Sequence, residues 1–197
     1  MARSGTMATV QNREALLIDQ ARRGDATAWE VLVRQHQEAA FRLAYLLLGG
    51  VSETHAADAE EVAQDAFVQA FLALDRFDGE RPFKPWLLQI VRNLVKNRQR
   101  SLSRYWQMVQ RWRQVQESVV KPAPVSQDEA TLLWQAVQKL RPTAQEVVYL
   151  RYFLEMSEAE TAVTLNIPAG TVKSRLHRAL KQLKAVIKVD FSELELP

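Results

Sequence analysis

Apolar residues recur along most of the chain at the 3.6-residue period of an α-helix, and its β-branched residues do not alternate with polar ones as strands require. The segments predicted to be helical are 14–22, 26–48, about 57–76, a fourth from about Trp86, 128–140 and 142–153. Residues 101–120 continue the pattern and either extend the fourth helix or form a separate one, whereas residues 52–55 are predicted to form a loop. The sequence therefore predicts an all-α protein.

A proline-containing stretch, Lys121–Ser126, separates two groups of predicted helices. Its two prolines disfavour a helix and favour a semi-extended tether, so we expect two helical domains joined by a flexible linker. The expected divisions are a disordered tail at 1–13, an N-terminal domain at 14–104, a linker that can include a helix extension at 105–127, a C-terminal domain at 128–188 with a helix-turn-helix at 157–181, and a tail at 189–197.

The helix-turn-helix segment has clear start and stop signals. Ser157 is a suitable N-cap, and Glu160, three residues later, completes a capping box. Asn166 is expected to end the first helix, and Pro168 can start the second without the loss of a hydrogen bond. Gly170 is expected to leave room for close packing between the two helices.

The second helix of this pair has one apolar and one cationic face. Its inward face is expected to contain Val172, Leu176, Ala179, Leu180 and Leu183. Its outward face contains Ser174, His177, Arg178 and Lys181, flanked by Lys173 and Arg175. No acidic residue occurs between Thr161 and Val189. Such a helix suits the major groove of duplex DNA. An ordinary solvated helix is the alternative, although solvated faces usually mix charges.

Charge is unevenly distributed along the chain, although the net charge is only +3. From Glu14 to Glu80 acids outnumber Lys and Arg by thirteen to five, whereas Arg81–Arg113 contains nine basic residues and no acid. This segregation predicts one surface for a protein partner and two for a polyanion, the second being the cationic helix already described.

The third predicted helix has a face that its own domain is not expected to bury. Ala63, Ala66, Phe67, Ala70 and Leu74 share the core side. The opposite side is a stripe of Glu61, Asp65, Val68 and Leu72, with Gln64 and Asp58 beside it. A stripe that mixes carboxylates with apolar residues is typical of a helix-docking interface. A charged face with two incidental aliphatic residues is the alternative. Catalysis or metal binding is disfavoured, because no His or Gly-rich loop occurs at a matching spacing.

The fourth predicted helix pairs a buried side with a cationic one. The polar side contains Lys84, Arg92, Asn93, Lys96, Asn97, Arg98 and Arg100. Basic residues that are interleaved with amides and aromatic rings are typical of surfaces that bind single-stranded DNA. The sequence leaves two roles open for Trp86, which is either a wedge beside an unstacked base or a core residue.

Several classes of protein are disfavoured by composition. Cysteine is absent, which excludes disulfides, thiolate metal sites and a cysteine nucleophile, and which fits a reducing cytoplasm. No run of some 18 apolar residues occurs and the N-terminus has no apolar signal-peptide core, so we expect a cytoplasmic protein without membrane insertion.

Three segments together resemble the extracytoplasmic-function (ECF) group of bacterial RNA polymerase sigma factors. They are DAEEVAQDAFVQAF at Asp58–Phe71, FKPWLLQIVRNLVKNRQR at Phe83–Arg100 and LRPTAQEVVYLRYFLEMSEAETAVTLNIPAGTVKSRLHRALKQL at Leu140–Leu183, similar to sigma regions 2.2, 2.3–2.4 and 4. The resemblance extends from Ala15 to Lys184. It implies a sigma region 2 domain and a sigma region 4 domain that bind core polymerase and recognise a promoter, without catalysis or a cofactor.

The resemblance also implies roles for individual residues. Binding to the polymerase β′ clamp helices falls to Asp58, Glu61, Gln64 and Asp65, with Val68 and Leu72 in the same stripe. Binding to the melted −10 strand falls to Trp86, Arg92, Asn93, Lys96 and Asn97, with Lys84, Arg98 and Arg100 on the same cationic side. Reading of the −35 duplex falls to Lys173, Ser174, His177 and Arg178, with phosphate contacts from Thr171, Arg175 and Lys181.

The partners that the resemblance implies are core RNA polymerase (β′ clamp helices and β flap), promoter DNA and an anti-sigma factor, since many members of the group are held by one. Phe71 departs from the commoner Trp and is expected on the core side. A stand-alone helix-turn-helix regulator is the alternative function, but it would not explain the basic segment Arg81–Arg113 or the stripe on the third helix. A helical enzyme that acts on nucleic acid is a third hypothesis, for which the sequence offers no phosphate loop or nucleophile–base pair.

Overall fold

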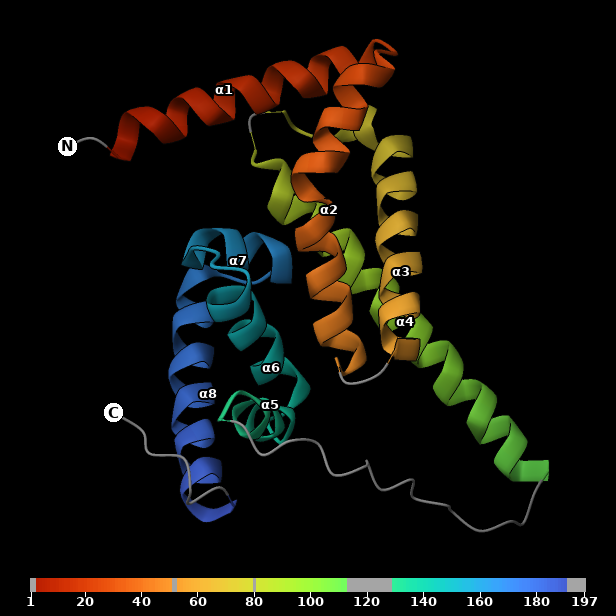
Figure 1. The fold of residues 1–197 in the computed structure, drawn as a ribbon, viewed down its shortest axis with the longest axis vertical. Coiled ribbons are helices and arrows are strands. Elements are labelled where there is room, and N and C mark those ends of the chain that lie inside the picture. Colours follow the sequence, from red (N-terminus) through yellow and green to blue (C-terminus); the bar gives the residue numbers. More distant parts are fainter. Residues whose placement is uncertain (1–2, 51–52, 80, 113–128, 191–197) are drawn as a thin grey trace.

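The computed structural model describes residues 3–50, 53–79, 81–112 and 129–190, and every regular element in those ranges is a helix (Figure 1). The elements are α1 (Arg3–Arg22), α2 (Ala26–Leu48), α3 (Glu53–Leu72), the 3₁₀ turn η1 (Leu74–Arg76), α4 (Phe83–Trp112), α5 (Glu129–Gln138), α6 (Pro142–Val148), the π-helical turn η2 (Tyr149–Phe153), α7 (Glu158–Leu165) and α8 (Ala169–Asp190). The expected all-α architecture of two helical domains is confirmed.

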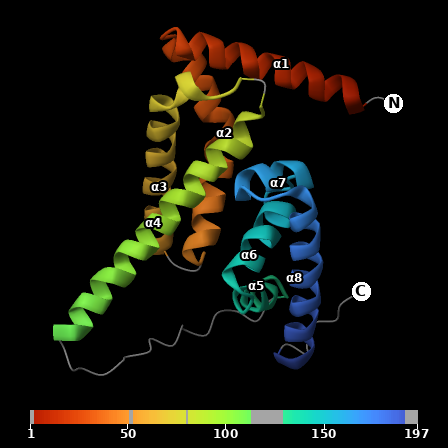
Figure 2. The same cartoon turned by 180° about the vertical axis from the view of Figure 1, so that it is seen from behind.

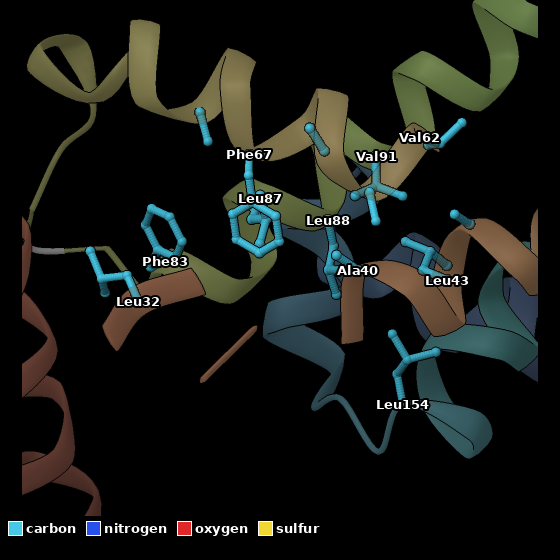
Figure 3. Close-up of a cluster of buried hydrophobic side chains, with 14 of the residues drawn as sticks. Leu32, Ala40, Leu43, Val62, Phe67, Phe83, Leu87, Leu88, Val91 and Leu154 are labelled. Atoms are coloured by element: carbon cyan, nitrogen blue, oxygen red, sulfur yellow. The ribbon is translucent and has the colours of Figure 1, made fainter. Parts of the chain in front are cut away.

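The N-terminal domain is a bundle of α2, α3 and α4, with α1 lying across one end (Figures 1 and 2). The bounds of α2 follow from local chemistry. The Asp25 carboxylate accepts hydrogen bonds from the backbone N–H groups of Thr27 and Ala28 at 2.9 and 3.2 Å, which caps the first turn. Gly49 ends the helix in the left-handed region, with φ at 107°. The core between the three helices includes Leu32, Leu43, Phe67, Phe83 and Leu87 (Figure 3).

Several helix bounds differ from the sequence-based expectations, and one alternative that the sequence left open is resolved. α1 begins at Arg3, so residues 3–13 are helical where a disordered tail was expected, because this segment contains no proline and continues a helix already formed by 14–22. α3 begins at Glu53, inside the expected loop at 52–55. α4 continues to Trp112, so the segment after Ser101 extends the fourth helix as far as that residue.

The C-terminal domain contains the expected helix-turn-helix. Ser157 Oγ accepts from the backbone N–H of Glu160, and the Glu160 carboxylate accepts from the backbone N–H of Ser157, so the capping box is formed. Asn166 ends α7 with φ at 53°. Gly170 does not serve close packing, because an added Cβ there would meet no atom within 4 Å. Leu180, expected to point inward, is 37% exposed because it lies at the edge of the apolar stripe.

The two domains share a hydrophobic core, and a smaller cluster of buried residues lies within the C-terminal domain. Leu154, Met156 and Leu165 of the C-terminal domain join the cluster of buried residues that fills the N-terminal bundle, and Figure 3 shows Leu154 pointing toward it. A second contact needs a glycine, since a Cβ at Gly50 would lie 2.7 Å from the ring of Trp134. The predicted hinge, Lys121–Ser126, lies outside the described residues. Within the described part of the chain, no helix is both long enough and apolar enough to span a lipid bilayer.

Candidate nucleic-acid and partner interfaces

The outward face of α8 presents the residues predicted to read duplex DNA. Exposed side chains are Lys173, Ser174, His177, Arg178 and Lys181, whereas Thr171 and Arg175 are half-buried. Val172 and Ala179, 0% and 1% exposed, fix the opposite face against the domain core. Ser174 Oγ donates to the Thr171 carbonyl at 3.1 Å, and Arg178 Nε donates to the Ser174 carbonyl at 3.2 Å. These bonds leave the Nη groups of Arg178 available for an acceptor on DNA.

A hollow of about 170 Å³ between α6 and α8 brings a further cation to this surface. Its lining includes Arg175, Arg178 and Arg141, the residue that precedes α6. Arg141 was not among the residues predicted to bind DNA, because α6, η2 and α7 separate it from α8 in the sequence. Only the packing of α6 on α8 brings it next to the other two arginines. Arg141 and Arg175, which are not assigned to a base, make this hollow a candidate site for a DNA phosphate beside the base-reading Arg178.

The exposed face of α3 combines carboxylates with apolar side chains. Gln64 and Asp65 are exposed, and Val68 and Leu72 are 59% and 78% exposed. Phe71 was expected on the core side, yet it is 50% exposed and packs against Trp29 in a T-shaped arrangement, with the ring centroids 5.2 Å apart. The helical period places residue 71 between the two faces, which explains the difference. The apolar part of the surface is therefore larger than the sequence predicted.

Arg98 links two sets of residues that the sequence assigned to different partners. It bonds the carboxylates of Asp58 and Glu61 at 2.6 and 2.8 Å. The hydrogen bond to Glu61, with the charges of Asp58, Glu61 and Asp65, raises the pKa of Arg98 despite its partial burial. Arg98 therefore lies against α3, beside the carboxylates predicted to bind core polymerase.

The remaining candidate residues of α4 divide into exposed and covered groups. Asn93, Asn97 and Arg100 are exposed. Arg92 and Lys96 form ion pairs with Glu146 of α6 at 3.1 and 2.8 Å.

Two further candidates lie near the start of α4. Lys84 Nζ donates to the Leu154 carbonyl at 3.3 Å. Trp86 is half-buried beside Phe77 and Phe83, with ring centroids 4.5 and 5.5 Å away, so it lies at the edge of the core. Among the described residues, no group of three or more His, Asp or Glu side chains is arranged to hold a metal ion.

A helix-turn-helix domain with an exposed cationic face on α8, packed on a second helical bundle, is typical of a DNA-binding protein built from two helical domains. The family described as Sigma-70 region 2 matches residues 32–105, and Sigma-70, region 4 matches residues 130–183. The ECF RNA polymerase sigma factor SigW of Bacillus subtilis is 32% identical over 182 residues, which cover 87% of this chain and 95% of SigW.

Two solved structures have the same fold. CnrH, in complex with the cytosolic domain of CnrY, is 27% identical with a TM-score of 0.64, over 90% of this chain and 99% of CnrH. RpoE of Bartonella quintana, in complex with the anti-sigma factor NepR, is 25% identical with a TM-score of 0.63, over 82% of this chain and 97% of RpoE. The chain belongs to the ECF group of bacterial RNA polymerase sigma factors. Members of this family are transcription initiation factors that bind core RNA polymerase and promoter DNA.

Proposed function

We infer that this sigma factor acts without catalysis, by distributing three binding tasks over three helices. α3 docks on core polymerase, α8 reads the −35 duplex, and α4 holds the melted −10 strand. The observation that carries this assignment is the contrast between two exposed faces: α8 presents cationic and polar side chains, whereas α3 presents Asp65 beside Val68, Phe71 and Leu72. The proposed place of action is the cytoplasm, where polymerase and promoter meet.

The α3 face fits a protein partner better than it fits a nucleic acid. Its carboxylates would repel phosphate, and its exposed apolar residues gain free energy only when a partner removes them from water. The clamp helices of polymerase β′ are the partner that the family resemblance implies. Because Arg98 already neutralises Asp58 and Glu61, we assign the charge-dependent part of docking chiefly to Asp65, which is exposed on α3.

Substitution of Asp65 by Arg tests the docking face. Asp65→Arg reverses a charge in the middle of the stripe and should reduce retention of the sigma factor on immobilised core polymerase by at least about tenfold, since a like-charge contact costs several kcal/mol. Asp75→Arg makes the same charge change at an exposed position of η1, outside the stripe, and should bind normally. Equal retention of Asp65→Arg and the unaltered protein would contradict the assignment.

Substitution of Arg178 by Ala tests the −35 assignment. A side chain that bonds a base edge contributes about 1–3 kcal/mol and confers preference at one position, so Arg178→Ala should relax selection at a single −35 base pair. The measurement is selection of promoter variants by the reconstituted holoenzyme, followed by sequencing of the transcripts. A uniform loss over all variants would make Arg178 a phosphate contact instead.

The same transcription assay separates this function from a stand-alone regulator. Linking two weak DNA contacts through polymerase raises the effective concentration of each at the other's site, so we expect promoter-specific transcripts only when core enzyme and this protein are both present. A stand-alone regulator would bind its operator equally well without polymerase. Since RpoE is found in complex with the anti-sigma factor NepR, and CnrH with the cytosolic domain of CnrY, we also propose that an anti-sigma factor can bind this chain.

A further inference from the structure

The C-terminal domain lies directly against the side of α4 that we assign to the −10 strand. Thr164 of α7 is fully buried and its Oγ1 donates to the Pro85 carbonyl at 3.2 Å. Lys84 Nζ donates to the Leu154 carbonyl at 3.3 Å. These two bonds join the first turn of α4 to the helix-turn-helix domain. A DNA strand that followed this part of α4 would have to displace that domain.

Glu146 makes the most specific contact of this interface. Its side chain is only 5% exposed. It bonds Arg92, a residue 54 positions away in the sequence. One carboxylate oxygen lies 3.1 Å from Arg92 Nη2 and the other lies 2.8 Å from Lys96 Nζ. A buried carboxylate is costly unless both oxygens are paired, and here both are. The charge pairing is therefore one of the contacts that hold the C-terminal domain against α4.

The pairing occupies two of the cations that we assign to the −10 strand. Arg92 and Lys96 lie one helical turn apart on the same face, and the same atoms cannot bond a carboxylate and a phosphate at once. Arg92 Nε is buried without a hydrogen-bond partner in the described part of the chain, so Glu146 does not bond every N–H donor of the Arg92 guanidinium group. A phosphate group, with more acceptor oxygens, can use more of it.

We propose that Glu146 is an internal competitor of the −10 strand: its carboxylate takes the place of a DNA phosphate on Arg92 and Lys96 and holds the free protein closed. This proposal rests on the −10 assignment made above. Binding of the melted strand then requires α6 to leave α4, and the closed protein binds single-stranded DNA weakly because only its open fraction is competent.

The ion pair is the part of the interface that separates most readily, because water solvates the released side chains well. The apolar contacts of Leu154, Met156 and Leu165 oppose opening, so the free protein stays mostly closed. The exchange is also balanced in charge, since an anionic phosphate replaces an anionic carboxylate on the same two cations. Core polymerase can therefore favour the open form by binding the two domains at separate positions.

A pair of spin labels measures the closed fraction directly. The chain contains no cysteine, so Ala57→Cys on α3 and Ala185→Cys on α8, both at exposed positions, give unique labelling sites in the two domains. In this doubly labelled protein, we expect pulsed electron paramagnetic resonance to give one narrow distribution of the distance between the two labels. Glu146→Gln keeps the shape of the side chain and removes its charge, and it should raise the population of a longer distance about tenfold or more.

Two further variants keep the test informative. Glu158→Gln makes the same charge change at an exposed position of the C-terminal domain and should leave the distribution unchanged. Thr164→Val removes the bond to Pro85 without touching any charge, and it should open the protein in the same direction but less than Glu146→Gln. Identical distributions for Glu146→Gln, Thr164→Val and Glu158→Gln would overturn the proposal.

Binding of a labelled single-stranded oligonucleotide of mixed sequence to the free full-length protein tests the competition itself. Glu146→Gln should increase this affinity about tenfold or more relative to Glu158→Gln, and an unchanged affinity would overturn the proposal.

Failure of the −10 assignment has a different signature. Arg92→Ala and Lys96→Ala can support normal promoter opening by the holoenzyme while Glu146→Gln still opens the free protein. In that case the Glu146 contact keeps the protein closed, but α4 is not the −10 site. If those two variants fail in promoter opening while Glu146→Gln stays closed, the −10 assignment stands and the proposed closing role of Glu146 is wrong.

Discussion

Arg141 lies where a single side chain can add to DNA binding without reading a base. It lines a hollow with Arg175, beside the base-reading Arg178, so a phosphate there would be neutralised by Arg141 and Arg175. We expect Arg141→Ala to weaken holoenzyme binding to promoter DNA about equally for all sequences and to reduce the slope of log affinity against log salt by about 1. Fluorescence anisotropy over a range of salt concentrations measures this. Arg23→Ala, an exposed cation of the N-terminal domain, is the control. A loss confined to one base pair would contradict the phosphate role.

Glu14 provides a residue-scale test of stability. Its carboxylate accepts from His36 Nε2 at 2.9 Å and from the backbone N–H of Phe83, the first residue of α4, at 3.1 Å. Burial raises the pKa of Glu14, but the two hydrogen bonds and the charge of His36 outweigh burial and lower the pKa below its ordinary value of 4.5. A depressed pKa means that this stabilisation is present above about pH 4.5 and is lost as the pH falls through the folded-state pKa.

Glu14→Gln should therefore lower the free energy of unfolding by about 1–3 kcal/mol near neutral pH, and the difference from the unaltered protein should shrink as the pH falls below 4.5. Urea unfolding at a series of pH values checks this. Glu38→Gln, at an 80% exposed side chain of α2, should have little effect at any pH. A constant difference between the Glu14→Gln variant and the unaltered protein over the whole series would show that the charge of Glu14 does not matter.

At the scale of one element, the helix-turn-helix depends on how α7 begins. Ser157→Ala removes the acceptor for the Glu160 backbone N–H and should cost about 0.5–2 kcal/mol of stability. Because α8 itself is unaltered, preference among −35 sequences should stay the same, while the C-terminal domain should unfold at a lower denaturant concentration. Denaturant unfolding followed by circular dichroism measures the stability, and promoter selection measures the sequence preference. Ser101→Ala, exposed on α4, is the matched control, and an equal loss in both variants would argue against the cap.

The elements that could be predicted from the sequence are those with local causes. Asp25 and Gly49 fix both ends of α2, and the pattern gave its bounds, Ala26–Leu48, without error. The burial of side chains at the edge of a helical face was harder to predict. Each residue turns the helix by about 100°, so a small difference in orientation decides whether Phe71 or Leu180 is covered. Such positions depend on the neighbouring helix, which the sequence does not locate.

At the scale of the whole molecule, the packing of the two domains could not be predicted. Glu146 lies between Gln145 and Val147 in an ordinary amphipathic segment, and nothing local marks it as the partner of a residue 54 positions away. The same holds for Arg141, which joins the cations of α8 only through tertiary packing. Both residues belong to the candidate sites. The sequence could therefore assign a partner class to each helix, but not the contact that decides when α4 is accessible.

The shared core predicts that the domains stay together after the chain between them is cut. A specific protease site inserted within Lys121–Ser126 allows this test, and the two fragments should co-elute in gel filtration because Leu154 and Met156 lie in the core of the N-terminal bundle. Leu154→Ala should release them, since a large-to-small change in a core costs about 2–5 kcal/mol. Leu133→Ala, at a position 40% exposed in the same domain, should not. Separate elution of the fragments without any substitution would mean that covalent tethering, and not the interface, keeps α6 on α4.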